Sequence, residues 1–227
     1  MSEAKKTRQI SESLEIGILL ALAGGFMDVY SYMCRGKVFA NAQTGNILLL
    51  GINISKGNFG EALQYLSPII AFVLGLFIAN IVRHKLKEMS LVHWRQLTIL
   101  LEIITLMAVS FMPQRLNLVA NSLTSLVCAI QVESFRKING SNAATTMCIG
   151  NLRTGVQELC DYIFTKNKNS KKTSITMLVL ILSFAVGAII GNIFITLFSE
   201  RAIAFSNIFL ITAFLIMFVN KTNKNHN

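Results

Sequence analysis

Charged residues and prolines are scarce in this chain. Of its 227 residues, only 14% are charged and 2 are proline, whereas 53% are hydrophobic and 15 are phenylalanine. A soluble domain usually carries about 25% charged residues, because its surface faces water. The shortage of charge argues against a soluble protein and predicts one membrane-embedded domain.

Metal-binding and catalytic motifs are also missing. The four cysteines (Cys34, Cys128, Cys148 and Cys160) form no C-x-x-C pair, so we expect buried thiols rather than a metal site or a structural disulfide. The chain contains no H-E-x-x-H, G-x-S-x-G or P-loop pattern, and its three histidines fall outside the apolar runs. We therefore expect no cofactor, no metal and no enzymatic activity.

What the chain has in abundance is long apolar runs. Several approach the roughly 20 residues that a helix needs to cross a bilayer. The predicted spans are residues 14–33, 62–82, 94–112, 116–135, 174–198 and 202–219. The expected fold is an all-α integral membrane protein with about six transmembrane helices. The polar start shows no clear signal-peptide cleavage site, so we expect the first helix to remain as an anchor.

The net charge of +10 does not point to nucleic acid, because the basic residues separate the apolar runs instead of clustering. If the amino terminus is cytoplasmic, most of the 21 basic residues fall in cytoplasmic segments, as the positive-inside rule requires. Two additional crossings would put the basic residues around 83–95 outside and nearly abolish this bias. Six spans with both termini cytoplasmic are therefore predicted.

The segment FANAQTGNILLLG, residues 39–51, is apolar but too short to cross a membrane. We expect it to enter and return, or to lie at the interface. Gly45 allows close approach of the backbone, and Thr44 or Asn46 is expected to cap a short helix whose amino end would attract an anion or a carbonyl oxygen. The alternative is that Thr44-Gly45-Asn46 only ends a dipping helix and packs against its neighbour.

The second half of the chain resembles the first. Aligned at a nearly constant spacing are Asp28 with Glu133, Gly45 with Gly150, Asn46 with Asn151, Gly75 with Gly187, and Asn80 with Asn192. Each half holds three spans, so the second copy would enter the membrane from the opposite side. This predicts inverted repeats, each with a short broken or re-entrant segment, as in transporters and channels. The expected parts are a cytoplasmic tail (1–13), two three-helix repeats (14–113 and 114–220) and a second cytoplasmic tail (221–227).

Three acidic residues are candidates for a solute or ion pathway. Asp28 and Glu102 lie deepest in the predicted spans, where a charge is costly unless it faces a cavity or a partner. Either could exchange protons. The alternatives are a structural hydrogen bond to a neighbouring helix end for Asp28 and a static buried pair for Glu102. Glu133 lies nearer a membrane boundary with Arg136 close by, so a local ion pair is its alternative.

The other candidates come from the second copy and from small residues. Thr145, Thr146, Gly150 and Asn151 are assigned to the pathway, although Ile149 replaces Thr44 and makes the two copies unequal. Close helix packing is predicted at Gly75, Ala79, Gly187 and Gly191, which have small-x-x-x-small spacing. Apolar residues on one helical face between 152 and 163, followed by Lys166, Lys168, Lys171 and Lys172, predict an interfacial helix beside anionic lipid.

The words AGGFMDVYSYM, VFANAQTGNILLLG, FVLGLFIA and GSNAATTMCIGNL resemble those of the YoaK family of bacterial inner-membrane proteins, a domain of unknown function. The resemblance extends from about residue 16 to residue 198. The family's motif positions fall on Gly25, Asp28, Phe39, Thr44, Gly45, Asn46, Gly75, Thr145, Thr146 and Gly150. It implies about six spans and a multi-pass place in the bacterial inner (cytoplasmic) membrane, and it brings no substrate.

These features favour a small-solute membrane transporter, with proton linkage through Asp28 or Glu102 as one form of it. The alternatives are a non-transporting membrane scaffold or regulator and a lipid-acting membrane enzyme. The expected partners are membrane lipids and an unknown small solute, with no nucleic acid, and a homo-oligomer stays open.

Overall fold

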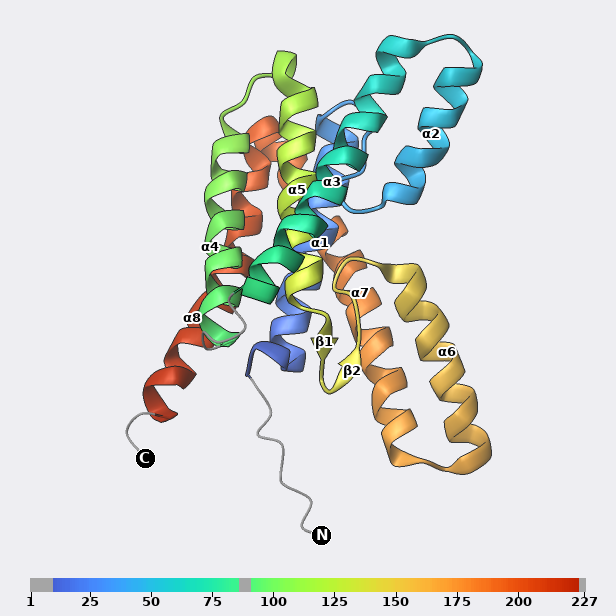
Figure 1. The fold of residues 1–227 in the computed structure, drawn as a ribbon, viewed down its shortest axis with the longest axis vertical. Coiled ribbons are helices and arrows are strands. Elements are labelled where there is room, and N and C mark those ends of the chain that lie inside the picture. Colours follow the sequence, from blue (N-terminus) through green and yellow to red (C-terminus); the bar gives the residue numbers. More distant parts are fainter. Residues whose placement is uncertain (1–9, 86–90, 225–227) are drawn as a thin grey trace.

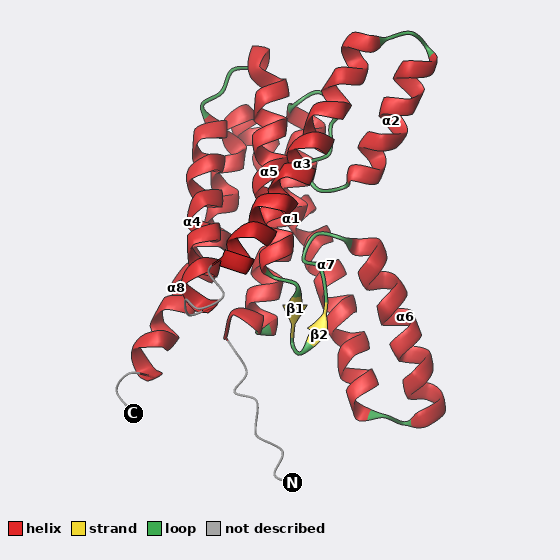
Figure 2. Cartoon of the chain, in the orientation of Figure 1, coloured by secondary structure: helices red, strands yellow, loops and turns green. Residues whose placement is uncertain are grey.

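The computed structural model describes residues 10–85 and 91–224, which fold almost entirely into helices (Figures 1 and 2). In chain order these are α1 (Leu14–Cys34), α2 (Gln43–Ser55), α3 (Phe59–Lys85), α4 (Leu91–Ser110), α5 (Asn117–Ser134), α6 (Cys148–Thr165), α7 (Lys168–Phe198) and α8 (Asn207–Lys224). Short 3-10 turns are η1 (Ile10–Glu12), η2 (Gln114–Leu116) and η3 (Ser199–Ser206). The all-α prediction is confirmed.

A small β-hairpin, which the sequence analysis missed, joins α5 to α6. Strands β1 (Lys137–Ile138) and β2 (Ser141–Asn142) pair antiparallel. Between them Asn139 and Gly140 have φ angles of 55° and 87°. Asn-Gly is the preferred pair for a two-residue hairpin turn, because both positions need positive φ. The local signal was therefore present in the sequence.

Within the described residues, four stretches are long and apolar enough to cross a membrane: Leu14–Cys34, Phe59–Lys85, Gln114–Ser134 and Lys168–Phe218. The last contains α7, η3 and most of α8. Large apolar side chains such as Phe77, Phe111 and Leu182 point outward from the helices. An apolar surface of this extent is unfavourable in water and matches contact with lipid tails. The chain is thus a membrane protein.

Helices lie at all six predicted spans, with shifted ends. The helix α7 begins at Lys168 rather than at residue 174, and α8 begins at Asn207 because residues 199–206 form the η3 turn. The number of crossings stays a prediction. The two predicted tails fall largely outside the described residues, which exclude 1–9 and 225–227.

Two helical hairpins project in opposite directions from a central bundle (Figure 1). The helix α2 packs on α3 at one end, and α6 packs on α7 at the other. Helices of the first half run opposite to their counterparts in the second half, as α1 and α5 do in Figure 1. The helices α2 and α6 begin at mid-height, so their amino ends face each other.

The two halves pack on each other reciprocally. The helix α1 lies along α7 and α3 lies along α5, while α8 packs on α1 and α4 packs on α5. The first helix of each half is therefore covered by two long helices of the other half: α1 by α7 and α8, and α5 by α3 and α4. This arrangement buries Phe26, Met27 and Tyr30 of α1 in one core with Cys128 of α5 and with Phe135 just beyond it.

Glycines permit the closest of these crossings. A Cβ atom on Gly187 would overlap the Leu22 carbonyl of α1, and one on Gly75 would overlap the Leu126 carbonyl of α5. Gly191 lies against Phe26 of α1. Ala79, one turn beyond Gly75 on α3, is also buried. Close approach of backbones is how apolar helices gain contact area in a membrane.

Two buried arginines close opposite ends of the bundle. Arg35, whose side chain is 1% exposed, donates to Tyr30 Oη (2.8 Å), Asn117 Oδ1 (3.1 Å) and the Val109 carbonyl (3.0 Å). At the other end Arg95 lies over the Phe135 ring and pairs with Glu12 (3.1 Å). Tyr30 and Phe135 are separated by the same interval along the chain as the aligned pair Asp28 and Glu133. These contacts tie the ends of α1 and α5 to the surrounding helices.

Replacing Gly187 with alanine tests the α1–α7 crossing. The added methyl group has no room beside the Leu22 backbone, so we expect a loss of about 2–3 kcal/mol in stability, or roughly 5–10 °C in the melting temperature of detergent-solubilised protein. Gly51→Ala is the matched control, because nothing lies within 4 Å of a Cβ at that helical position. An unchanged melting temperature for Gly187→Ala would contradict the observed packing.

Candidate functional site

The buried side chain of Asn46 holds the chain just before α2. Its Oδ1 accepts a hydrogen bond from Phe39 N (3.0 Å), and its Nδ2 donates to the Phe39 carbonyl (2.8 Å) and to Gln43 Oε1 (2.8 Å). The asparagine amide thus pairs with one residue's backbone as a neighbouring strand would. It satisfies polar groups that an apolar environment would otherwise leave without partners.

Asn151 makes the same clamp in the second half. Its Oδ1 accepts from Ala144 N (3.2 Å) and its Nδ2 donates to the Ala144 carbonyl (2.5 Å). Ala144 and Phe39 precede their asparagines by the same interval. The asparagine of each aligned Gly-Asn pair therefore has the same local role: it holds an extended segment against the first turn of a short helix.

The expected capping role of Thr44 or Asn46 is wrong. The N-cap of α2 is Ala42, with no side-chain cap bond, and both residues lie inside the first turn of the helix. The Asn46 side chain instead turns back and bonds to the Phe39 backbone. Gly45 leaves room for the Phe39 ring, which a Cβ atom there would strike.

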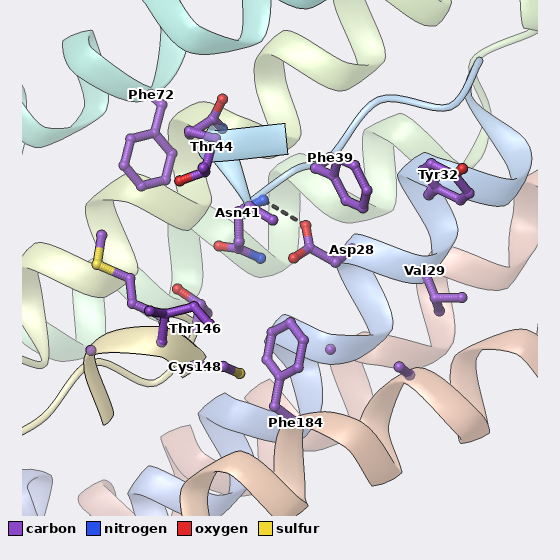
Figure 3. A pocket seen from close by; sticks show the side chains of 17 residues that line it. Asp28, Val29, Tyr32, Phe39, Asn41, Thr44, Phe72, Thr146, Cys148 and Phe184 are labelled. Atoms are coloured by element: carbon purple, nitrogen blue, oxygen red, sulfur yellow. Dashed lines mark hydrogen bonds between the residues drawn. The ribbon is translucent and has the colours of Figure 1, made fainter. Parts of the chain in front are cut away.

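Asp28 anchors the same loop from α1. Its Oδ1 accepts from Asn41 N at 2.6 Å (Figure 3), and the Asn41 Nδ2 donates to the Gly24 carbonyl (3.3 Å). Ser31 adds a bond from Ala40 N to its hydroxyl (3.0 Å). The carboxylate therefore makes the structural hydrogen bond to a neighbouring helix end that was one of the two readings of Asp28.

A cavity of about 610 Å³ lies where the amino ends of α2 and α6 meet. The helix α1 contributes Asp28, and α7 contributes Phe184. In the view of Figure 3, the Asn41 amide and the Asp28 carboxylate lie between Phe72 and Phe184. The other residues that line the cavity are Gly25, Val29, Tyr32, Phe39, Ala42, Gln43, Thr44, Thr146, Met147, Cys148, Ile149, Gly150 and Ala188.

Two polar atoms of the lining have no partner in the described part of the chain. Asn41 Oδ1 and Thr146 Oγ1 are buried, and each residue is 5% exposed, yet neither atom makes a hydrogen bond. A buried polar group without a partner costs about 1–3 kcal/mol. Such atoms beside a cavity are candidates for hydrogen bonds to water or to a bound molecule.

The structure gathers only some of the predicted site residues around this cavity. Asp28, Thr44, Thr146 and Gly150 line it. Gly45, Asn46, Thr145 and Asn151 lie behind the lining and support it through the contacts of the loops. Glu102 and Glu133 are elsewhere. Asn41, Cys148 and Phe184 were missed, although Asn41 is a polar residue in the same apolar word as Thr44.

Glu102 is buried in a short polar chain. The Gln131 amide is oriented so that its nitrogen donates to the two Glu102 carboxylate oxygens (2.8 and 3.0 Å) and its oxygen accepts from Thr145 Oγ1 (3.0 Å). Thr145 precedes the cavity residue Thr146. Hydrogen bonds therefore connect Glu102 of α4 through Gln131 to Thr145, the residue before the cavity wall.

Glu133 lies outside the cavity in an ion pair with two arginines. Its Oε1 is 3.1 Å from Arg136 Nη1, one turn away, and 3.6 Å from Arg83 Nη1 of α3. The Arg136 contact is the local pair that the sequence allowed. The carboxylate links the ends of α3 and α5.

All four cysteines are free thiols, and within residues 10–85 and 91–224 no three His, Cys, Asp or Glu side chains are grouped to hold a metal ion. The cavity therefore has hydrogen-bonding groups, a carboxylate and aromatic rings as its recognition chemistry. The amino ends of α2 and α6 add backbone partial positive charge.

Comparison with known proteins places these residues in a family. The family described as "Protein of unknown function (DUF1275)" matches residues 16–216. The chain is 28% identical over 183 residues to the UPF0700 transmembrane protein YoaK of Bacillus subtilis (strain 168), which covers 76% of this chain and 79% of that protein. No solved structure matches the chain.

The asparagine clamps can be tested by Asn46→Leu and Asn151→Leu. Each change removes two bonds to the backbone of a part-buried loop, so we expect about 1–3 kcal/mol lower stability per variant, measured by thermal unfolding in detergent. Asn58→Leu serves as the control, because Asn58 is exposed in the turn after α2. If Asn46→Leu melted together with Asn58→Leu, the clamp would carry no stability.

Proposed function

The chain belongs to the DUF1275 family, whose function is unknown, and we propose that it is a small-solute transporter of the bacterial inner membrane. The cavity between α2 and α6 carries this proposal, since it combines room for a small molecule with buried polar atoms that lack partners. Sites of this kind in transporters lie where broken or short helices from two halves meet. The protein acts on no bond of its solute.

The proposed architecture is two inverted repeats, residues 14–113 and 114–220, with six crossings. Its support is the reciprocal packing of α1 with α7 and of α3 with α5, together with the matching clamps of Asn46 and Asn151. The short helices α2 and α6 then enter from opposite sides without crossing. Such repeats let two halves rock against each other around one central site.

The proposed orientation puts both termini in the cytoplasm. The α6–α7 tip carries Lys166, Lys168, Lys171 and Lys172, whereas the α2–α3 tip carries Lys56. These tips lie at opposite ends of the molecule (Figure 1). The positive-inside rule then assigns the lysine-rich tip to the cytoplasmic side. The Lys166 and Lys171 ammonium groups lie over the Tyr162 ring, near the level where lipid headgroups would be.

A scaffold or regulator is the second candidate function. One observation favours it: the side chains of Asp28, Asn46 and Asn151 all form hydrogen bonds with the protein's own backbone. In that case the cavity would stay closed to one side of the membrane. Access to the cavity therefore separates the two functions.

Cys148 offers a native probe of this access, because its side chain lines the cavity. We expect that a variant with Cys148 as the only cysteine reacts with a membrane-impermeant maleimide in both right-side-out and inverted membrane vesicles. A transporter must expose its central site to each side in turn. The measurement is the fraction labelled at several times, read by mass shift after denaturation.

The matched control keeps Cys160 alone, since this residue is exposed on α6 and does not line the cavity. In the proposed orientation it should react from one side only. Labelling of Cys148 from a single side, with folded protein confirmed by size exclusion, would reject transport and favour the scaffold.

Proton linkage predicts that the reactivity of Cys148 varies with pH beyond the titration of its own thiol. Protonation of Asp28 as pH falls weakens the bond from Asn41 N and loosens the cavity loop, so Cys148 should react faster relative to Cys160 at low pH. Tyr32 and Cys148 are the other titratable side chains that line the cavity. Asp28→Asn should remove the pH response, and Glu102→Gln tests the second acid. An unchanged response in both variants would exclude linkage through these residues.

A further inference from the structure

Two buried polar atoms at the cavity wall lack hydrogen-bond partners, and one of them can be satisfied only by a donor. Asn41 Oδ1 is a carbonyl oxygen, which can only accept a hydrogen bond. The Nδ2 of the same amide is already bound to the Gly24 carbonyl. Thr146 Oγ1 can accept or donate. Both atoms are buried at the cavity wall and neither has a protein partner. A molecule that fits them presents at least one O–H or N–H group.

The rest of the wall is mostly apolar. Rings of Phe39, Phe72 and Phe184 face the cavity with Val29 and Ile149. Burial of apolar ligand surface against such side chains contributes about 25 cal/mol per Å². A strongly hydrated molecule, such as a sugar or a free amino acid, would lose its water without enough partners to replace it. The wall thus favours a molecule with an apolar body.

The charges around the cavity nearly cancel. The Asp28 carboxylate brings one negative charge, and the amino ends of α2 and α6 each bring roughly half a positive charge. Gln43 and Cys148, the first residues of these helices, belong to the lining, which contains no lysine or arginine among its residues in the described chain. A charged ligand would be left without a counter-charge in a place of low dielectric.

We propose that this cavity binds an uncharged small molecule that has an apolar or aromatic body and a hydroxyl or amide donor. The ligand's O–H or N–H group donates to Asn41 Oδ1, Thr146 Oγ1 donates to or accepts from the same polar group, and the body packs between Phe72 and Phe184. This assignment rests on the proposed function, because it names the class of solute for the same site. It excludes inorganic ions, sugars and amino acids as the solute.

Four monosubstituted benzenes of nearly equal size test the assignment: benzyl alcohol, toluene, benzylammonium and benzoate. Purified protein with Cys148 as its only cysteine is labelled with N-ethylmaleimide in detergent while each compound is present at millimolar concentration. Benzyl alcohol should slow labelling more than the other three, with an apparent affinity about threefold to tenfold above that of toluene, since a net hydrogen bond is worth about 1 kcal/mol. Protein with Cys160 alone controls for effects on the reagent and the detergent.

Thr146→Val removes the hydroxyl and keeps the shape of the side chain. In this variant the advantage of benzyl alcohol over toluene should become smaller without vanishing, because the bond to Asn41 Oδ1 remains, while toluene itself keeps its affinity. Thr105→Val is the matched control, because Thr105 is exposed on α4 and bonds only to the Leu101 carbonyl of its own helix. It should retain the full advantage.

Equal protection by toluene and benzyl alcohol, or no protection by any compound, would overturn the assignment. Stronger protection by benzoate or benzylammonium would also overturn it and would show that the charges do not cancel. The two proposals can fail separately. Labelling of Cys148 from both membrane sides without donor selectivity would keep transport and reject this solute class, whereas selective protection with one-sided labelling would keep the ligand class and reject transport.

Discussion

The structure depends on one constraint, which is that a helix interrupted inside an apolar environment must find partners for the backbone groups it frees. The chain breaks twice in this way, before α2 and before α6. In each case an asparagine amide bonds to both the N–H and the C=O of one residue in the preceding loop. Asp28 adds a further acceptor at the first break. The two short helices can begin in mid-bundle because these polar groups are satisfied.

The second organising feature is the exchange of helices between the halves. The helices α1 and α5 are the most buried, and each is covered mainly by helices from the other half. Glycines at 75 and 187 bring the crossing backbones together. Because neither half buries its own first helix, the two halves form one folding unit. The cavity lies at their junction and is lined by both, so any relative movement of the halves would change its shape.

The sequence predicted the helices better than it predicted the site. Apolar runs located every long helix, since a membrane requires apolar side chains on most faces of a span. Thr44 and Asn46 were correctly predicted to lie at a break between helices, but the capping role expected of them was wrong. A side chain in the first turn can bond either to its own helix or to the loop before it, and the sequence does not show which. Asn41 and Phe184 were missed for a similar reason. Nothing local distinguishes an asparagine that faces a cavity from one that packs.

By itself the sequence determined that this chain is a helical membrane protein, and it predicted a polar break at each of the two aligned Gly-Asn positions. These properties follow from composition and periodicity, which act within a few turns of chain. Only the tertiary structure decided that the two breaks meet end to end and that Glu133 pairs with arginines. It likewise placed Asn41 and Thr146, residues distant in the sequence, with open polar atoms on one cavity. Such juxtapositions depend on how crossing helices pack over long sequence separations, which local pattern does not encode.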